Sequence, residues 1–317
     1  MEDINCIFCG RASERVAIRE NGYCGRQCET CGLIYVSPRP GAAEVSALYG
    51  TDEAHVSARE QLNAETLKRI HARHHLEIIK RHVPRGTLLE IGAGAGFFLD
   101  EARTAGFEPH AIELNHAQAG YIRKVHEIPC EEKPLGEGAF NGREFDIMFH
   151  CDVISHLPDP LTEFRNMNAA LRSRGVLVFE TGNLGEVDPR YYRLFSRFQY
   201  PDHLFFFTVQ NLVDLLSRTG FDVVEIYRYS LVPQLSFNRA VTWVRKTLRG
   251  GRAASDRNPA APSGGGDELP VKPNERPAGL RRRVRERLNA FLRYGVGRVA
   301  PLPRRPQTVL VIARKAT

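Results

Sequence analysis

The sequence predicts an α/β fold in which a mostly parallel sheet is covered by helices on both faces, with a small cysteine-rich unit ahead of it. From residue 86 onward, apolar strand-like runs alternate with amphipathic segments, which is the pattern of a doubly wound sheet. One of these runs enters a glycine-rich turn, and two cysteine pairs precede the whole region. The 317 residues, 42% of them hydrophobic, suffice for one main core and a smaller attached unit.

The first forty residues carry the cysteine pairs. Two residues separate Cys6 from Cys9 and Cys28 from Cys31, and eighteen residues lie between the pairs. A two-residue spacer closes a tight turn with both thiolates facing inward, and two such turns complete a tetrahedral zinc site with no open position. We therefore predict a structural zinc ribbon over residues 1–40. Coincidental or redox-active thiols are the alternative.

Helices are predicted in the connector that follows, residues 41–85, because apolar residues recur there among many charged ones. His71 and His75 lie four residues apart and could share a helical face as a metal pair. We favour packing or solvated roles for them.

The main domain is predicted over residues 86–232 and is completed by residues 307–317. Its strands are predicted at 87–91, 108–112, 126–130, 145–150, 175–180, 221–227 and 308–314. Its helices are predicted at 96–105, 115–124, 159–172 and 209–218. The gap before the fourth strand is predicted to be a loop.

Residues 233–306 form a basic insertion before the last strand. It contains seventeen Lys or Arg and five Asp or Glu, which give it a charge of +12. Because the net charge of the whole chain is +7, the other residues together carry 7 − 12 = −5. Residues 250–279 are rich in Gly, Pro, Ser and Ala and are predicted to be flexible. Residues 280–300 predict an amphipathic helix with arginines around an apolar stripe. The stripe consists of Leu280, Val284, Leu288, Phe291, Leu292, Val296 and Val299.

Three partners remain open for this stripe. The first is the protein's own core, and the second is an anionic membrane surface, with the stripe among acyl chains and the arginines at headgroups. The third is nucleic acid, which we disfavour because phosphate binding alone requires no apolar stripe.

The glycine-rich turn is the stretch "LLEIGAGAGFF", with glycines at 92, 94 and 96. No Lys followed by Ser or Thr comes after it, so it is not a triphosphate loop. Glu90 lies just ahead of the glycines, where it would repel pyrophosphate and attract a cationic ligand. Glu113 follows Glu90 by 23 residues, a spacing suited to a carboxylate that binds ribose hydroxyls.

The ordered motifs resemble those of class I S-adenosylmethionine-dependent methyltransferases. "LLEIGAGAGFFL" is similar to the first motif of that family and "AIELN" to the second. "FDIMFHCDVISHLPDP" and "GVLVFETGN" resemble its fourth and fifth strands, and "PDHLFFFTVQNLVDLLSRTGFDVVEI" resembles the helix and strand that follow. The cysteine pairs ahead of "PRP" are similar to a zinc ribbon of the small-molecule subgroup, which includes sugar C-methyltransferases and related O-methyltransferases. The resemblance implies a Rossmann-like seven-stranded methyltransferase sheet.

The resemblance also implies S-adenosylmethionine as co-substrate. The glycine turn would line its methionine moiety and Glu113 its ribose, while Glu131 would flank the adenine. His150 and Cys151 would lie near the sulfonium. The implied set is Glu90, Gly92, Ala93, Gly94, Gly96, Glu113, Glu131, His150 and Cys151.

Two histidines are candidate catalytic bases, because methyl transfer can require removal of a proton from the acceptor. His156 follows the fourth strand, and His203 lies on the loop after the fifth. Many relatives have Glu-His where this chain has Ser155-His156, so His156 is predicted to lack a supporting carboxylate. Bracing of loops is the alternative role for both. The predicted acceptor wall comprises Tyr191, Tyr192, Phe195 and Tyr200.

The predicted function is methyl transfer to oxygen or carbon of a small acceptor, either sugar-, lipid- or polyketide-like. One alternative is an RNA methyltransferase, although "HCDV" replaces the tetrapeptide typical of base N-methylation. Another is a zinc-ribbon binding protein with an inactive domain. No signal peptide or membrane-spanning run is evident, so we expect a cytoplasmic location. If the stripe meets lipid, residues 280–300 would contact the inner face of the membrane.

Overall fold

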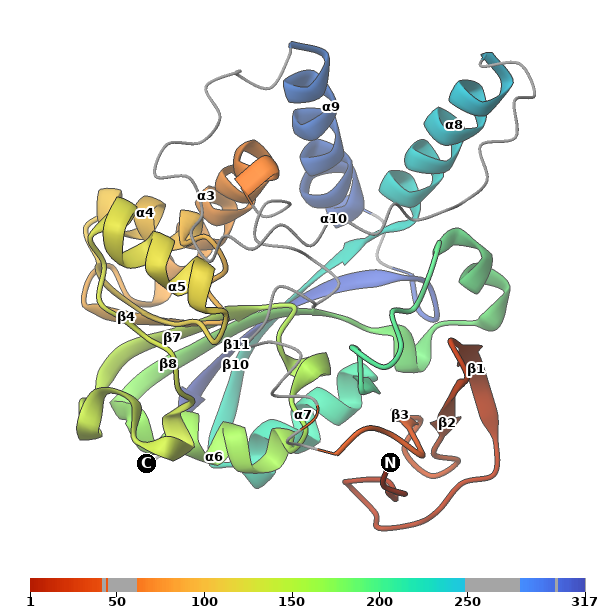
Figure 1. Cartoon of the computed structure of the whole chain (residues 1–317), viewed down its shortest axis with the longest axis horizontal. Helices are drawn as coiled ribbons and strands as arrows, with labels where there is room; N and C mark the ends of the chain where they lie inside the picture. The colour runs from red at the N-terminus through yellow and green to blue at the C-terminus, as the bar shows by residue number, and fades with distance from the viewer. Residues whose placement is uncertain (42–43, 45–61, 249–279, 300–301, 317) are drawn as a thin grey trace.

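The computed structural model describes residues 1–41, 44, 62–248, 280–299 and 302–316. Its centre is a seven-stranded sheet of order β10-β11-β8-β7-β4-β5-β6 (Figure 1). The strands are β4 Thr87–Ile91, β5 Glu108–Ile112, β6 Cys130–Glu131, β7 Phe145–Cys151, β8 Leu171–Gly182, β10 Phe221–Ser230 and β11 Gln307–Lys315. The run from β8 to β6 is parallel, and β11 is antiparallel to both neighbours. The predicted α/β fold is confirmed.

Helices cover both faces of this sheet (Figure 1). One face carries α3 Glu65–His82, α4 Phe97–Thr104 and α5 His116–Tyr121, and the other carries α6 Pro160–Ala170 and α7 Val209–Arg218. Successive strand residues point to opposite faces, so Leu88 packs in the same cluster as Leu76, whereas Leu89 packs with Phe164 and Leu212. Both faces are therefore buried, as a parallel sheet requires.

The third strand of the main domain is shorter than predicted. A π-helical turn, η1 Ile122–His126, continues α5 through the first residue of the predicted strand. Glu127 then ends the helix with φ of 53°. Only Cys130 and Glu131 remain to pair with β5. The gap before β7 holds two 3-10 turns, η2 Leu135–Glu137 and η3 Ala139–Gly142.

The amino-terminal unit is a second small sheet of order β1-β2-β3-β9. Its strands are β1 Val16–Glu20, β2 Tyr23–Gln27, β3 Ile34–Val36 and β9 Phe205–Phe206. The last strand comes from the loop that carries His203, far away in the sequence. Its pairing with β3 joins the cysteine-rich unit to the main domain.

The basic insertion contains more helix than the sequence predicted. Helix α8 Val232–Leu248 occupies its first part, and α9 Leu280–Ala290, η7 Phe291–Val296 and α10 Gly297–Val299 occupy its last part. Residues 250–279, predicted to be flexible, lie outside the described residues, as do residues 42–43 and 45–61 of the predicted connector. In the described part of the chain, no helix combines the length and apolarity needed to cross a membrane.

Of the apolar stripe predicted on residues 280–300, the structure describes the side chains of five members, and four of them face away from the protein's own core. Val284, Leu288, Phe291 and Val296 are exposed, whereas Glu286 and Asn289 are buried. Packing on the core was one of the three alternatives for the stripe, and these four side chains do not show it. Glu286 and Asn289, together with Ala290 and Tyr294, take the inward-facing positions instead.

Candidate active site

The glycine turn lies at the carboxyl end of β4, next to the point where the chain order of the strands reverses between β4 and β7. Ligands of doubly wound sheets bind in the crevice at such points. Gly92 has φ of +70°, and a Cβ there would lie 2.7 Å from Val153 Cγ2. The Gly94 backbone N–H donates to Glu113 Oε2 over 2.6 Å. The turn is thus held against the end of β5.

Two buried carboxylates lie beside this turn. Glu113 Oε1 accepts from the Asn115 N–H over 2.9 Å. Burial raises the pKa of Glu113 to about 6, although hydrogen bonds from Asn115 and Gly94 oppose the rise. Glu90 is 6% exposed, and its Oε2 has no hydrogen-bond partner among the described residues. Burial, with Glu113 adding to it, raises the pKa of Glu90 well above its usual value, although Lys68 opposes the rise.

A cavity of about 1110 Å³ opens above these carboxylates. Drug-sized ligands occupy pockets of roughly 300–1,000 Å³, so this cavity has room for a nucleoside co-substrate and an acceptor together. The predicted site residues on its wall are Glu90, Gly92, Ala93, Gly94, Glu113, Cys151, His156 and His203.

The two candidate bases lie next to each other on this wall, with ring centroids 4.5 Å apart. His156 Nδ1 is 3.3 Å from Asp202 Oδ1 and 3.0 Å from the Asp202 carbonyl oxygen. His203 Nδ1 lies 3.0 Å from the carbonyl oxygen of Phe198. The prediction that His156 lacks a carboxylate was wrong. Asp202, 46 residues downstream, replaces the adjacent glutamate.

Aromatic residues line the acceptor side, but mostly not the predicted ones. Phe195 is on the wall, whereas Tyr191, Tyr192 and Tyr200 are not. These tyrosines pack with the amino-terminal sheet. The other aromatic lining residues of this region are Phe198, Phe205, Phe206 and Phe207.

Three predicted cofactor residues do not line the cavity: Gly96, Glu131 and His150. Gly96 begins α4 in a left-handed conformation. Glu131 Oε1 accepts from the Phe140 N–H.

The expectation for His150 is incorrect for a simple geometric reason. Phe149 and Cys151 face the cavity, so the residue between them points to the opposite face of the strand. There its ring stacks on Phe179 with centroids 5.0 Å apart, and burial lowers its pKa to about 3.

Several cavity residues were not predicted. Asp152 follows β7 with φ of 55°, and Asn115 and Gln118 follow β5. Their positions after strand ends were the available signal. Arg293, from the far end of the basic insertion, also reaches the wall, and nothing in the sequence indicated this contact.

Arg293 belongs to a buried polar cluster centred on Glu180, which is 0% exposed. One Glu180 oxygen accepts from Arg293 over 2.6 Å, and the other accepts from Tyr294 over 3.0 Å and lies 2.9 Å from His75 Nε2. Burial acts to raise the pKa of Glu180, but Arg293 and His75 outweigh it and hold the pKa well below its usual value. The cluster ties α3, β8 and η7 together beside Cys151.

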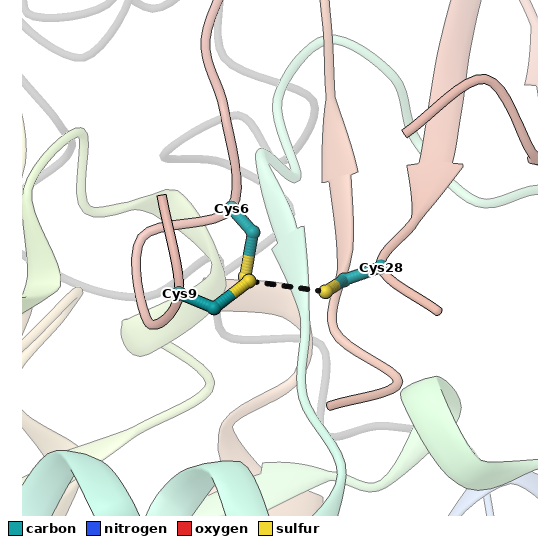
Figure 2. Close-up of side chains that lie close together, drawn as sticks. All are labelled: Cys6, Cys9 and Cys28. Atoms are coloured by element: carbon teal, nitrogen blue, oxygen red, sulfur yellow. Dashed lines mark hydrogen bonds between the residues drawn. The ribbon is translucent and has the colours of Figure 1, made fainter. Parts of the chain in front are cut away.

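Cys6, Cys9 and Cys28 point toward one another (Figure 2), and Cys31 contacts Cys6 in the same cluster. Cys9 Sγ lies 3.5 Å from Cys28 Sγ, and Cys6 Sγ lies 3.5 Å from Cys31 Sγ. Tetrahedral zinc with bonds of about 2.3 Å places sulfurs about 3.8 Å apart, so this spacing fits the ion. Burial acts to raise the pKa of Cys28, but hydrogen bonds from the Cys31 and Thr30 backbone outweigh it and lower the pKa to about 7.

The hairpin between β1 and β2 holds the loop that carries His203. Glu20 accepts from the backbone N–H groups of Phe198 and Tyr200 over 2.8 and 2.9 Å. Asn21 Nδ2 donates to the Tyr200 carbonyl oxygen over 2.8 Å. The cysteine-rich unit therefore fixes the backbone from which one candidate base projects.

A comparison with known families bears on this site. A family model described as "Methyltransferase domain" matches residues 58–226, more than half of the chain. The chain belongs to the methyltransferase domain family. This membership confirms the resemblance inferred from the motifs. The matched span of this methyltransferase contains the glycine turn, both carboxylates and both candidate bases.

Individual relatives match shorter segments of the methyltransferase. The ubiquinone biosynthesis O-methyltransferase of Haemophilus ducreyi is 28% identical over 106 residues, which cover 30% of this chain and 45% of that protein. A tRNA U34 carboxymethyltransferase of Nautilia profundicola is 28% identical over 114 residues, which cover 33% and 37%. The chain thus spans less than half the length of these curated relatives.

Among solved structures, geranyl diphosphate C-methyltransferase from Streptomyces coelicolor is similar to this methyltransferase with a TM-score of 0.47 and 16% identity. The superposition covers 77% of this chain and 76% of that one.

Proposed function

We propose that this chain transfers a methyl group from S-adenosylmethionine to an oxygen or carbon atom of a small acceptor. The unpartnered Oε2 of buried Glu90 is the observation that carries the proposal, because it lies beside the glycine turn. A buried carboxylate oxygen without a hydrogen-bond partner is costly unless a polar or cationic group binds it. The co-substrate would bring an ammonium to Glu90 and ribose hydroxyls to Glu113, whose oxygens retain free lone pairs.

Bound S-adenosylmethionine would supply an electrophilic methyl group. In a direct displacement the protein mainly aligns the acceptor with that methyl group and removes a proton where needed. His156 is our candidate base, since Asp202 orients its ring toward the cavity wall. His203 lies beside it and would position the acceptor or share the proton. The phenylalanines around them favour an acceptor with apolar surface, such as a lipid-, polyketide- or deoxysugar-like molecule.

We also propose that Cys6, Cys9, Cys28 and Cys31 bind one structural zinc ion. The sulfur spacing supports it, because it matches the distance between thiolates that bind one tetrahedral zinc ion. We further propose a cytoplasmic location with peripheral contact at the inner face of the membrane through residues 280–300. Exposed apolar side chains of that segment support this contact.

Calorimetry with S-adenosylmethionine tests the proposed activity at its first step. The wild-type protein should bind, and Glu113→Ala should weaken binding by about ten- to a hundredfold, because hydrogen bonds to a charged group contribute roughly 1.5–3 kcal/mol. Glu132→Ala is the matched control, since Glu132 pairs with His116 and Arg123 instead of lining the cavity. Absence of binding by the wild-type protein would contradict the proposal.

A further inference from the structure

We propose that α8 and the α9–η7 helix together form a docking surface for an anionic phospholipid membrane. This inference rests on the proposed function and names a partner for the same enzyme. Figure 1 shows both helices projecting from the same side of the molecule. We call their exposed side chains the helix surface. Its apolar members are Trp243, Val244, Val284, Leu288, Phe291 and Val296.

Large apolar side chains dominate the helix surface. Trp243 is 68% exposed, Phe291 61% and Val284 56%. Val284, Leu288 and Phe291 recur at helical spacing and thus form one stripe along α9 and into η7. Contiguous exposed apolar area of this kind marks an interaction site on a folded protein.

The inward side of the same helix explains why the apolar side faces outward. Arg293 and Tyr294 reach inward to Glu180, and Glu286 and Asn289 are buried. Rotation of the helix to bury Phe291 would break this cluster and leave charged groups unpaired. The outward direction of the stripe is therefore set by specific contacts.

The charge on the helix surface has one sign. Arg239, Arg283, Arg287 and Arg298 are exposed, and residues 232–248 contain no Asp or Glu. The acidic residue of α9, Glu286, is buried and pairs with Arg282 over 2.9 Å. Apolar side chains flanked by arginines match the layering of an anionic bilayer, in which acyl chains lie beneath phosphate headgroups. Trp243 suits the boundary between these layers.

Other occupants fit the helix surface less well. A second copy of the chain would set arginine against arginine, so charge opposes self-association through these helices. Nucleic acid would satisfy the arginines but would leave Trp243, Val284 and Phe291 without an apolar partner.

The geometry also relates the helix surface to the active-site cavity. Arg293 lines the cavity, and Phe291, two residues away, is exposed on the helix surface. A docked membrane would therefore meet the outer side of the same helical turn whose inner side helps to enclose the acceptor.

The single tryptophan of the sequence, Trp243, makes the test direct. Full-length protein is mixed with vesicles of phosphatidylcholine alone or with added phosphatidylglycerol. We expect a blue shift of tryptophan emission and co-flotation with the anionic vesicles, and neither with the neutral ones. High salt should weaken binding, because it screens the arginines.

Variants separate the apolar and the charged contributions. Phe291→Ser and Val284→Ser together should reduce vesicle binding about tenfold or more, whereas Val223→Ser and Val224→Ser, exposed on β10, should leave it unchanged. Arg283→Gln with Arg287→Gln should reduce it by a similar factor, and Arg165→Gln with Arg190→Gln serves as the control. Each variant is also tested for S-adenosylmethionine binding by calorimetry.

Retained S-adenosylmethionine binding without any binding to anionic vesicles would overturn the docking surface and leave the proposed function standing. Loss of S-adenosylmethionine binding in the wild-type protein would instead contradict the proposed function. A blue shift that depends on protein concentration without lipid would replace the membrane with a second copy. Salt-sensitive RNA binding without vesicle binding would replace it with nucleic acid.

Discussion

Glu113 shows how one side chain can serve both the fold and the ligand. Its side chain accepts hydrogen bonds from the backbone N–H groups of Gly94, in the glycine turn, and of Asn115, which precedes α5. Burial raises its pKa to about 6. Protonation would place an O–H donor on one oxygen and make the carboxyl a weaker acceptor than the ionised form. The ligand therefore favours the deprotonated state.

We predict that S-adenosylmethionine affinity falls as the pH drops through about 6, by up to about tenfold per unit. The sign follows because protonation of Glu113 competes with the ribose hydroxyls for the same oxygens. Calorimetry across pH 5–8 measures the effect. Glu113→Gln should remove the part of the pH dependence that is centred near pH 6, and Glu132→Gln should keep it. An unchanged profile in Glu113→Gln would assign the titration to another group.

Glu180 binds two side chains of the basic insertion, Arg293 and Tyr294. Burial acts to raise its pKa, but Arg293 and His75 hold the pKa below the unfolded value of about 4.3. A depressed folded pKa stabilises the fold above the unfolded pKa, and this stabilisation is lost as the pH falls through the folded pKa.

We predict that Glu180→Gln lowers the free energy of unfolding by about 3–5 kcal/mol at pH 7, because Arg293 is left buried without its counter-charge. Denaturant titration measures this, and the difference from wild type should shrink below about pH 4. Glu14→Gln is the control, since Glu14 is 94% exposed and pairs with Arg26 at the surface. A loss under 1 kcal/mol in Glu180→Gln would contradict the role of the cluster.

The sequence predicted the site residues that lie next to strand ends. It did not predict the residues that reach the site only when distant segments of the folded chain come together. Glu90, Glu113 and His156 follow from motif position. Asp202 beside His156 and Arg293 beside Glu180 are set by loop and helix placement, which no local pattern encodes. The prediction for His150 was wrong because a motif gives the position of a residue along a strand but not the face of the sheet to which its side chain points.

Among the elements, the β1–β2 hairpin has a role beyond its own sheet. Glu20 at the end of β1 holds two amides of the loop before β9, and Gly25 on β2 gives room to Tyr200, since a Cβ there would collide with its phenol oxygen.

We predict that Glu20→Ala increases amide hydrogen exchange at Phe198 and Tyr200 by about tenfold or more, because each hydrogen bond contributes roughly 0.5–1.5 kcal/mol and bonds to charged groups more. Hydrogen exchange with mass spectrometry on peptides spanning 196–204 measures it. Glu14→Ala, on the same unit but exposed, should leave these peptides unchanged. Equal protection in both variants would show that the loop holds its conformation unaided.

Most regular elements were predictable because their apolar periodicity is local. The parallel strands β4, β5 and β7 and helix α7 lie within a residue or so of their predicted bounds. The exceptions have physical causes. The π-helical turn η1 occupies the first residue of a predicted strand. Helix α8 lies in the insertion, whose first part was characterised by its charge and not by its periodicity. Strand β9 pairs with residues about 170 positions away, and no local pattern indicates such a pairing.

For the whole molecule, the proposed zinc ion links folding of the amino-terminal unit to the active site. We predict about one zinc per chain by elemental analysis, lost when Cys28 and Cys31 are both replaced by Ser, because two thiolates cannot close the site. Cys24→Ser is the matched control, since Cys24 contacts Arg19 and lies outside the cluster. The glycine turn belongs to the large sheet, so S-adenosylmethionine binding should survive. A folded, metal-free wild-type protein would refute the site.

The pairing of β9 with β3 has a practical consequence for anyone who divides the chain. A fragment that begins after residue 40 would retain β9 but lose its hydrogen-bonding neighbour, so Phe205 and Phe206 would lie on a bare strand edge. Unpaired edges rich in aromatic residues invite intermolecular pairing. Domain exchange between relatives must therefore carry the ribbon and this short strand as one unit, although about 170 residues separate them in the chain.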